Sequence, residues 1–385
     1  MYGHPLSYRG LVHEGADSHD LTGAVVGVVG AGTMGAGIAQ VALEGGHEVV
    51  LYDVDELALE RGVDRLRTGL GRRAARLELD AGSIDDWVEG RLANLRTALT
   101  LDAVGAVAEV VIEAALEDLD LKRTIFLALD RDLPAEALLA TNTSALPVAA
   151  IAEATNRPGR VLGLHFFNPA PLMALVEVIR GPQTDEATVD QAVELMKRWG
   201  KTPVVSEDAP GFIVNRVNRP FTIEALRMLE AGAAGIADID EAIRGAGYPM
   251  GPFELMDLIG IDVNLAVATA VWEGLGRPDR LRPSPIQQRL VDERRLGRKT
   301  GLGFYAYPDR QRGEPADDLL PARARADSIG AADVVSRIEG AIAREAGLAL
   351  ADGVASADAI DAGLRLGAGH PSGPFEAGRV PPGPP

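Results

Sequence analysis

The 385-residue chain carries 38 basic and 56 acidic residues, a formal net charge of −18, and no cysteine. Its length allows two or three domains with a sizeable core, and no apolar run reaches the roughly 18 residues of a membrane span. The charge argues against nucleic acid as a partner. The lack of cysteine excludes disulfides and thiolate catalysis and is compatible with a cytoplasmic enzyme.

Residues 1–22 are polar and lack the charged-then-apolar pattern of a signal peptide. We expect them to form a disordered arm. Their histidines, His4, His13 and His19, fit no standard metal-ligand spacing, so no metal site is expected.

A glycine-rich turn follows, between an apolar strand, Val25–Val29, and a helix expected from about Met34 to Glu44. The turn, Gly30-Ala31-Gly32-Thr33-Met34-Gly35, matches the G-x-G-x-x-G pattern of dinucleotide-binding folds. The first glycine permits the tight turn, the second lets a pyrophosphate approach the backbone, and the third lets the helix pack against the strand.

A second strand, Glu48–Tyr52, ends at Asp53, where an acid binds the ribose 2′-hydroxyl of a dinucleotide. Asp53 would repel a 2′-phosphate, so the pattern favours NAD over NADP. The predicted cofactor-binding residues here are Gly30, Gly32, Thr33, Met34, Gly35 and Asp53.

Six arginines follow on one predicted helix of this acidic protein: Arg61, Arg65, Arg67, Arg72, Arg73 and Arg76. Such a run is often a solvated helix face. The alternative is a landing site for a phosphorylated substrate handle, with Arg72, Arg73 and Arg76 as substrate-binding candidates.

The strand pattern resumes in residues 95–101, 110–114 and 138–141, with helices expected around 103–108 and 121–129. This alternation predicts a doubly wound parallel sheet. The segment TNTSAL then puts Asn142 and Ser144 just past a strand end, where ligands bind in such sheets. A turn or helix cap is the alternative for this polar cluster.

The segment RVLGLHFFNPAPLMALVEVIRG has two apolar runs separated by a turn that contains Pro169 and Pro171. If the runs form a hairpin, His165 and Glu177 become neighbours. Glu177 shares a strand face with Leu175 and Ile179, so its carboxylate needs a partner, and a histidine beside it would gain basicity. A core histidine and a solvated glutamate are the alternative.

A helix around Glu186–Trp199 and a strand, TPVVSE, complete the first domain, and helical periodicity takes over at residues 207–211. We therefore expect a Rossmann-type α/β domain over 23–208 and an all-α domain over 209–307. The latter contains one long helix, FIVNRVNRPFTIEALRMLEAG, two shorter ones around 239–244 and 254–270, and a closing loop, GRKTGLGFYAY.

The C-terminal part resembles a degenerate second copy of the helical domain. Residues 334–347 align with 213–226, and DAGLRLGAGHPSGPFE (361–376) aligns with DEAIRGAGYPMGPFE (240–254). In this alignment Ser336 stands opposite Asn215. We expect a linker over 308–328, the repeat over 329–378 and a disordered tail over 379–385.

Several motifs resemble the NAD-dependent 3-hydroxyacyl-CoA dehydrogenases: GAGTMGAGIAQ, TNTSAL, GLHFFNPAPLMALVEVI, PGFIVNR, GYPMGPFELMD and GRKTGLGFY. The resemblance covers about residues 22–307 and, through the repeat, extends to about 378. It implies NAD-dependent oxidation of (3S)-3-hydroxyacyl-CoA in fatty-acid or related metabolism.

The resemblance also implies roles for individual residues. His165 is the catalytic base and Glu177 its partner, Ser144 and Asn215 bind the oxygen at C3, and Asn168 supports the same site. The implied cofactor contacts beyond the glycine-rich turn are Glu117, Lys122, Asn142 and Lys299.

One departure concerns the coenzyme A handle. Where relatives place a serine and a lysine, this chain has Gly69 and Arg76. The remaining alternatives are an acyl substrate that is dicarboxylic or held on a carrier protein, a sugar-acid dehydrogenase of related plan, and a non-catalytic NAD-binding structural or sensor protein. We expect an acyl-CoA partner, no membrane, and an internal pseudo-dimer of the two helical copies, with a homodimer as the alternative.

Overall fold

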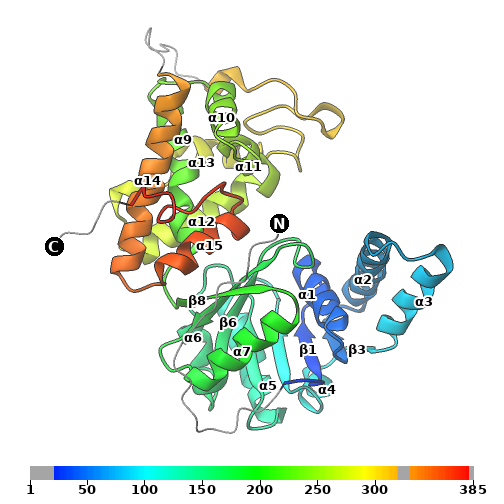
Figure 1. The fold of residues 1–385 in the computed structure, drawn as a ribbon. Helices are drawn as coiled ribbons and strands as arrows, with labels where there is room; N and C mark the ends of the chain where they lie inside the picture. The colour runs from blue at the N-terminus through cyan, green and yellow to red at the C-terminus, as the bar shows by residue number, and fades with distance from the viewer. Residues whose placement is uncertain (1–20, 320–328, 381–385) are drawn as a thin grey trace, which may run out of the picture.

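The structure, a computed structural model, describes residues 21–319 and 329–380. They form two lobes, one built on a sheet and one made of helices (Figure 1). Most of the expected N-terminal arm, residues 320–328 of the linker and the end of the tail lie outside the described residues.

The sheet lobe contains one eight-stranded sheet in the order β3-β2-β1-β4-β5-β6-β7-β8. The strands from β3 to β6 in this order pair in parallel, whereas β7 pairs antiparallel with β6 and parallel with β8. The strands are β1 (Val26–Val29), β2 (Val49–Tyr52), β3 (Leu95–Ala98), β4 (Val110–Glu113), β5 (Leu138–Thr141), β6 (Val161–Phe166), β7 (Leu175–Arg180) and β8 (Thr202–Glu207). This is the doubly wound arrangement that the strand and helix pattern predicts.

Helices cover both faces of this sheet. On one face lie α1 (Thr33–Glu44), α2 (Glu56–Arg76), α3 (Ala81–Leu92) and α7 (Glu186–Arg198). On the other lie α4 (Leu101–Gly105), α5 (Leu119–Asp132) and α6 (Val148–Ala152). The sequence analysis missed α3, because its two glycines and its mostly exposed side chains leave no apolar period to detect.

The helical lobe departs from the sequence prediction in two places. The long helix is divided at Asn218 into α8 (Val214–Val217) and α9 (Arg219–Glu230), although the backbone at Asn218 stays helical. The helix predicted around 254–270 is two helices, because Gly260 takes φ 103° and bends the chain by 102°. The helices of this part are α10 (Ile236–Gly245), α11 (Pro252–Ile259), α12 (Ile261–Gly274) and α13 (Pro285–Asp292).

Of these, α13 was not predicted. Within the described residues no single helix is long and apolar enough to cross a membrane; α11 and α12 reach those limits only jointly, across their bend.

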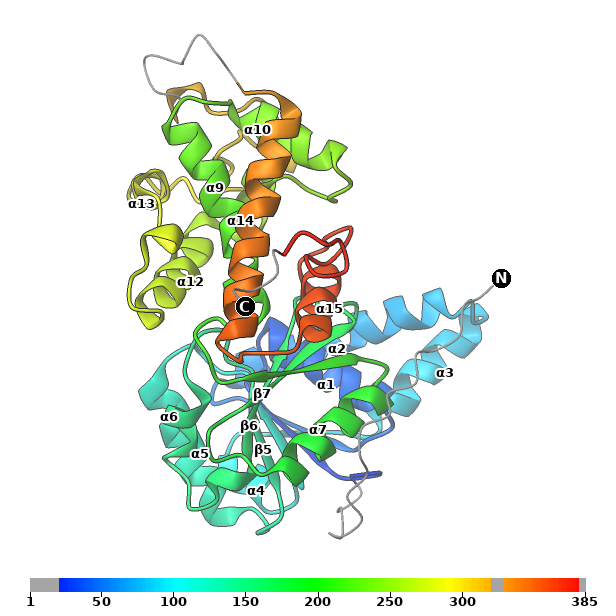
Figure 2. The same cartoon turned by 60° about the vertical axis from the view of Figure 1, so that its left-hand side comes forward.

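The C-terminal helices α14 (Ala331–Ala351) and α15 (Ala357–Gly367) pack on the first helices of this lobe. The long helix α14 lies along α9 and α10, and α15 lies between α8 and the strands β7 and β8 (Figure 2). Residues that the sequence analysis assigned to a linker and a tail also form ion pairs with this lobe. Asp318 pairs with Arg289 and Arg295, and Arg379 pairs with Glu339 of α14.

One local geometry occurs twice in the helical lobe. The carboxylate of Asp240 accepts hydrogen bonds from the backbone N–H groups of Phe253 and Glu254, at 2.9 and 3.0 Å. The carboxylate of Asp361 accepts from the N–H groups of Phe375 and Glu376, at 2.9 and 2.7 Å. In both places the glycine two residues before the phenylalanine, Gly251 or Gly373, lies so close to the aspartate that no side chain would fit there.

Contacts between the two aligned segments are reciprocal. Arg216 of the first pairs with Glu345 of the second at 3.0 Å, and Arg337 of the second pairs with Glu224 of the first at 2.9 Å. Backbone hydrogen bonds also join the two segments in both directions, from Glu207 N to Val354 O at 2.8 Å and from Ile329 N to Ala233 O at 3.0 Å. Tyr248 and His370, opposite each other in the alignment, stack with ring centroids 4.9 Å apart.

Candidate active site

The glycine-rich turn between β1 and α1 has the geometry of a dinucleotide site. Gly30 takes φ 104°, and a Cβ at Gly35 would lie 1.7 Å from the Gly30 carbonyl oxygen, so neither position accepts a side chain. A Cβ at Gly32 would meet no atom within 4 Å, so the turn is open there to an approaching phosphate. The site therefore fits NAD, with the α1 N-terminus directed at the pyrophosphate.

Asp53 lies at the end of β2 and also holds this turn. Its Oδ2 accepts a hydrogen bond from Ala31 N at 2.8 Å, and its Oδ1 accepts one from Asp55 N at 3.1 Å. These two backbone hydrogen bonds hold the carboxylate beside the glycine-rich turn, where the ribose of a bound dinucleotide would lie.

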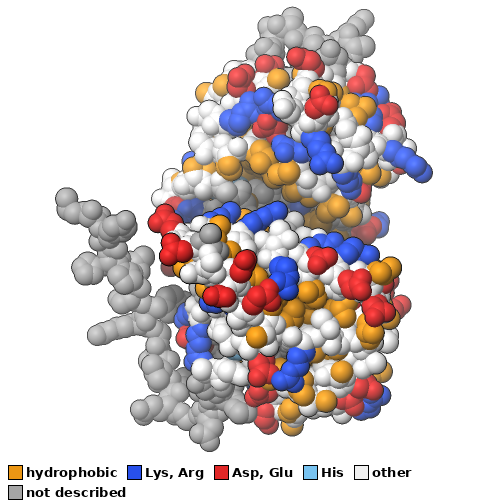
Figure 3. All heavy atoms as spheres, turned by 90° about the vertical axis from the view of Figure 1, so that its right-hand side faces the viewer, with side chains coloured by type: hydrophobic (Ala, Val, Ile, Leu, Met, Phe, Trp, Pro, Cys, Tyr) orange, Lys and Arg blue, Asp and Glu red, His pale blue; other side chains and the backbone are white. Residues whose placement is uncertain are grey.

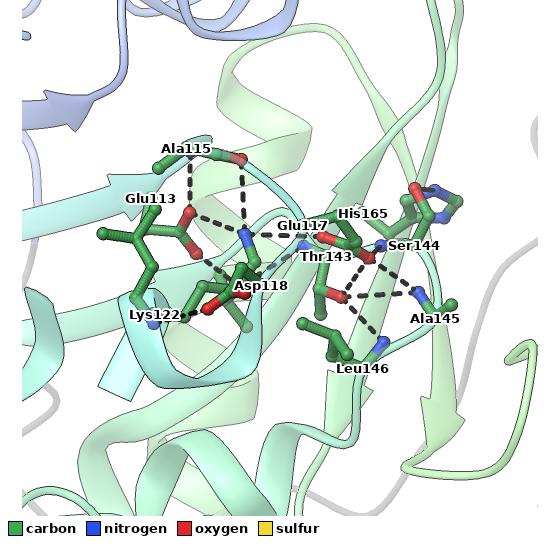
Figure 4. Close-up of polar contacts among 12 residues, drawn as sticks. Glu113, Ala115, Glu117, Asp118, Lys122, Thr143, Ser144, Ala145, Leu146 and His165 are labelled. Carbon is green, nitrogen blue, oxygen red and sulfur yellow. Dashed lines mark hydrogen bonds and ion pairs between the residues drawn. The ribbon is translucent and has the colours of Figure 1, made fainter. Parts of the chain in front are cut away.

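A buried ion pair, absent from the sequence analysis, lies at the carboxyl ends of β4 and β5 (Figure 4). Glu113 and Lys122 are 2.6 Å apart and at most 1% exposed. Glu113 also accepts hydrogen bonds from the Thr141 hydroxyl and from Ala115 N, both at 2.7 Å. This network fixes the strand ends next to the turn. The signal in the sequence that could have indicated this ion pair was Glu113 itself, a carboxylate at the end of the otherwise apolar run VVIE.

Glu117 orders the loop that carries Ser144. One of its oxygens accepts from the Thr143 hydroxyl at 2.6 Å, from Ser144 N at 2.9 Å and from Ala145 N at 3.1 Å. Lys122 Nζ lies 3.5 Å from the other oxygen. Both residues thus have internal partners, and their contact with the cofactor stays a prediction.

His165 and Glu177 are directly opposed in the antiparallel β6–β7 pair, as the hairpin interpretation required. Nδ1 of His165 lies 2.5 Å from Oε2 of Glu177, and both side chains are buried. The second carboxylate oxygen accepts from Ile213 N at 3.0 Å and Val214 N at 2.8 Å, at the start of α8. A carboxylate held in this way fixes the ring so that Nε2 is turned toward Ser144.

The other predicted catalytic residues gather around that nitrogen. Ser144 Oγ lies 3.2 Å from His165 Nε2, and Asn215 Nδ2 donates to the Ser144 carbonyl oxygen at 3.3 Å. Asn142 Oδ1 accepts from Phe166 N at 2.8 Å, which ties the end of β5 to β6. Phe167 packs on the imidazole with ring centroids 4.7 Å apart and forms an apolar wall that the sequence analysis did not identify.

Asn168 is placed differently. It is exposed on the β6–β7 turn and lines a cavity of about 470 Å³ between α1, α2 and this turn. The turn is held by Lys201, whose Nζ donates to the carbonyl oxygens of Ala170 at 2.6 Å and Met173 at 2.9 Å. Burial lowers the pKa of Lys201.

The same cavity is lined by four of the six arginines of the α2 cluster: Arg65 and the three predicted substrate-binding residues Arg72, Arg73 and Arg76. Gly69 lies in it as well, and a Cβ there would be 2.0 Å from Oε1 of Gln40. A serine at this position could enter only if Gln40 moved. In Figure 3 basic side chains lie along the edge of the sheet lobe at the waist of the molecule.

Lys299 is not joined to these residues by any recorded contact within the described part of the chain. Its Nζ pairs with Asp262 of α12 at 2.5 Å, in the helical lobe. Its role toward the cofactor therefore stays a prediction.

Comparison with known proteins identifies both lobes. The family described as 3-hydroxyacyl-CoA dehydrogenase, NAD binding domain, matches residues 25–209. The family described as 3-hydroxyacyl-CoA dehydrogenase, C-terminal domain, matches residues 211–307 and 334–380.

Individual relatives agree with this assignment. The chain is 48% identical over 283 residues to a 3-hydroxyadipyl-CoA dehydrogenase of Escherichia coli, covering 73% of this chain and 58% of that protein. It is 44% identical over 285 residues to the mitochondrial hydroxyacyl-coenzyme A dehydrogenase of Rattus norvegicus, covering 73% of this chain and 90% of that one.

Among solved structures, a 3-hydroxybutyryl-CoA dehydrogenase of E. coli superimposes with a TM-score of 0.82 at 37% identity, covering 92% of this chain and 91% of that one. The glycine-rich turn with Asp53, the opposed His165 and Glu177, and these matches across both lobes lead to one conclusion: the chain belongs to the family of NAD-dependent 3-hydroxyacyl-CoA dehydrogenases.

Proposed function

We propose that this NAD-dependent oxidoreductase oxidises the C3 hydroxyl of a 3-hydroxyacyl-CoA with His165 as the catalytic base. The observation that carries the proposal is the position of His165 Nε2, which faces Ser144 while Nδ1 is held by Glu177. Proton transfer needs a base within hydrogen-bond reach of the hydroxyl, and Nε2 is the ring nitrogen that Glu177 leaves available for this.

Each neighbour has a role in that step. Glu177 stabilises the imidazolium that forms when His165 takes the hydroxyl proton, because its carboxylate is buried against the ring. Ser144 and Asn215 supply donors toward the oxygen at C3 as it becomes a carbonyl. NAD, when bound at the glycine-rich turn, supplies the redox chemistry.

The coenzyme A handle is proposed to lie in the cavity between α1, α2 and the β6–β7 turn. Arg72, Arg73 and Arg76 provide cationic groups for its phosphates at this opening. Asn168, which lines this cavity and follows His165 by three residues, is proposed to bind the substrate near its reacting end.

The experiment that tests this function is NADH oxidation with three substrates offered in parallel: acetoacetyl-CoA, acetoacetyl-carrier protein and a keto sugar acid. We expect turnover with acetoacetyl-CoA and little with the other two. His165→Gln serves as the inactive control. A chain that binds NAD and turns over none of the three would contradict the proposal and favour a structural or sensor role.

We also propose that residues 329–378 act as an internal partner of the helical domain at 209–307. The ion pairs Arg216–Glu345 and Arg337–Glu224 support this. Arg216 aligns with Arg337 and Glu224 aligns with Glu345, so each ion pair is the counterpart of the other, as in a two-fold interface. The second segment would hold no active site, since Ser336 stands opposite Asn215.

Truncation after Tyr307 tests the internal pseudo-dimer. It exposes the apolar residues of the first helical domain that α14 covers, so we expect the shortened chain to aggregate or to dimerise. The full-length chain should elute as a monomer in size-exclusion chromatography. A truncated chain that stays a stable monomer, or a full-length homodimer built on the same helices, would contradict the proposal.

A further inference from the structure

Arg219, the first residue of α9, has a buried side chain and no counter-charge. It is 6% exposed, and its Nε makes no hydrogen bond. Among the described residues, no hydrogen bond or ion pair of its terminal nitrogens is recorded either. Burial lowers the pKa of its guanidinium to about 10. A buried, unpaired cation is costly, so its presence calls for an explanation beyond packing.

Arg216, one turn away, shows how this helix satisfies a buried arginine that has a structural role. It is only 1% exposed, and two carboxylates, Glu345 and Asp352, pair with it. The lack of any such partner therefore distinguishes Arg219 from its neighbour.

The position of Arg219 relates it to the reaction centre. The backbone at Asn218 is helical, with φ −81° and ψ −6°, so residues four apart share a face through the α8–α9 junction. Asn215, four residues before Arg219, donates to the Ser144 carbonyl oxygen beside His165. Arg219 thus follows the C3-oxygen donor by one turn, about 6 Å along the helix axis.

The second helical segment shows what this face borders. Opposite Asn215 and Arg219 the alignment places Ser336 and Gly340, and both line an open cavity of about 1030 Å³ between α10 and α14. The equivalent neighbour of α8 and α9 is α15. By this correspondence, the face of α8 and α9 that carries Arg219 is directed toward α15, which contacts α8.

The side chains that lie between the site and α15 are apolar. A Cβ at Gly367 of α15 would lie 2.6 Å from Leu175, 3.1 Å from Val214 and 3.3 Å from Phe167, the ring that packs on His165. An apolar wall thus extends from the imidazole toward α15. Apolar surroundings of this kind suit an acyl chain, and an unpaired guanidinium one helical turn beyond Asn215 suits an anion.

We propose that Arg219 binds the terminal carboxylate of a dicarboxylic 3-hydroxyacyl-CoA, which makes it a specificity-determining residue. The proposal rests on the function proposed above and adds the chemical class of the acyl chain. In a C6 dicarboxylic chain, three C–C bonds of about 1.5 Å separate C3 from the terminal carboxyl carbon. The length of these three bonds together with the reach of the Arg219 side chain is close to the helical turn that separates Asn215 from Arg219.

The test compares 3-hydroxyadipyl-CoA with 3-hydroxyhexanoyl-CoA, which has the same length and no terminal charge. Wild type should favour the dicarboxylic substrate. Arg219→Met keeps the length and removes the charge, so kcat/KM for that substrate should fall roughly 10- to 100-fold, mainly through KM, as expected for a charge-assisted hydrogen bond. The monocarboxylic substrate should be used as well as before or better, and Arg219→Lys should recover part of the loss.

Arg227→Met is the matched control on the same helix. Its guanidinium pairs with Glu224, and the substitution should leave the ratio of the two substrates unchanged. An equal loss on both substrates in Arg219→Met, or no change on either, would overturn the role of Arg219 alone. A wild-type chain that oxidises neither substrate would overturn the proposed function itself.

Discussion

His165 and Glu177 are paired across β6 and β7 with Nδ1 and Oε2 2.5 Å apart, and the same carboxylate also caps the first helix of the other lobe. Glu177 therefore connects the imidazole to the helical lobe through Ile213 N and Val214 N. Since Asn215 follows these residues directly, one carboxylate positions both the proposed base, His165, and the proposed donor to the C3 oxygen, Asn215.

The first prediction concerns this pair. His165→Gln should lower kcat by roughly 10²- to 10⁴-fold, the usual size of general acid–base assistance. Glu177→Gln should also lower kcat, because an amide group facing Nδ1 no longer holds the tautomer that leaves Nε2 free as a base. Steady-state kinetics with acetoacetyl-CoA measure both effects. Near-normal turnover of His165→Gln would reject its assignment as the base.

The second prediction concerns cofactor choice. Asp53→Ser should erode the preference for NAD over NADP, because the carboxylate that would repel a 2′-phosphate is removed. KM for NAD should rise as well, since Asp53 also holds Ala31 N of the glycine-rich turn. The ratio of kcat/KM for the two cofactors is the measurement. An unchanged ratio would place ribose recognition elsewhere.

The third prediction concerns the arginine helix. Neutralising Arg72, Arg73 and Arg76 together should raise KM for acetoacetyl-CoA and weaken its salt dependence, with KM for NADH unchanged. Arg61→Ala is the control, because this arginine of the same helix pairs with Asp55 and does not line the cavity. If the triple variant matches the control, the three arginines form a solvated face.

Strong local patterns made much of the fold predictable. The glycine-rich turn, the apolar strands and the proline turn between residues 165 and 177 each follow from local rules of backbone geometry and alternation. The split at Gly260 was not visible, because a positive φ at a glycine depends on how the following helix packs. The helix α3 was missed because its side chains are mostly exposed and leave no apolar period, and α13 because it has only eight residues.

Part of the site could not be predicted for a different reason. The ion pair of Glu113 and Lys122 joins residues on a strand and a helix, and only the assembled sheet shows that both are buried. The missing partner of Arg219 is likewise a property of its surroundings, since the sequence shows only one more basic residue in a helix.

The last prediction concerns pH and His370, at the contact between the two helical segments. Its Nε2 donates to Asn218 Oδ1 at 2.8 Å, and its ring stacks on Tyr248 and packs against Phe221. Burial, assisted by the like charge of Arg379, lowers the pKa of His370 from 6.5 to about 4. The unfolded chain then binds more protons than the folded one between these values, so stability is lost as the pH falls through 6.5 toward 4.

Between pH 7.5 and 5.5 this histidine should cost the folded state about 1 kcal/mol. The measurement is urea unfolding at both pH values for wild type and His370→Gln, which keeps an N–H donor for Asn218 and does not titrate. Comparing the loss of unfolding free energy in the two proteins cancels the contribution of the carboxylates, which both proteins share. His370→Gln should lose less stability than wild type on acidification, and parallel losses would show that His370 is not buried as a neutral ring.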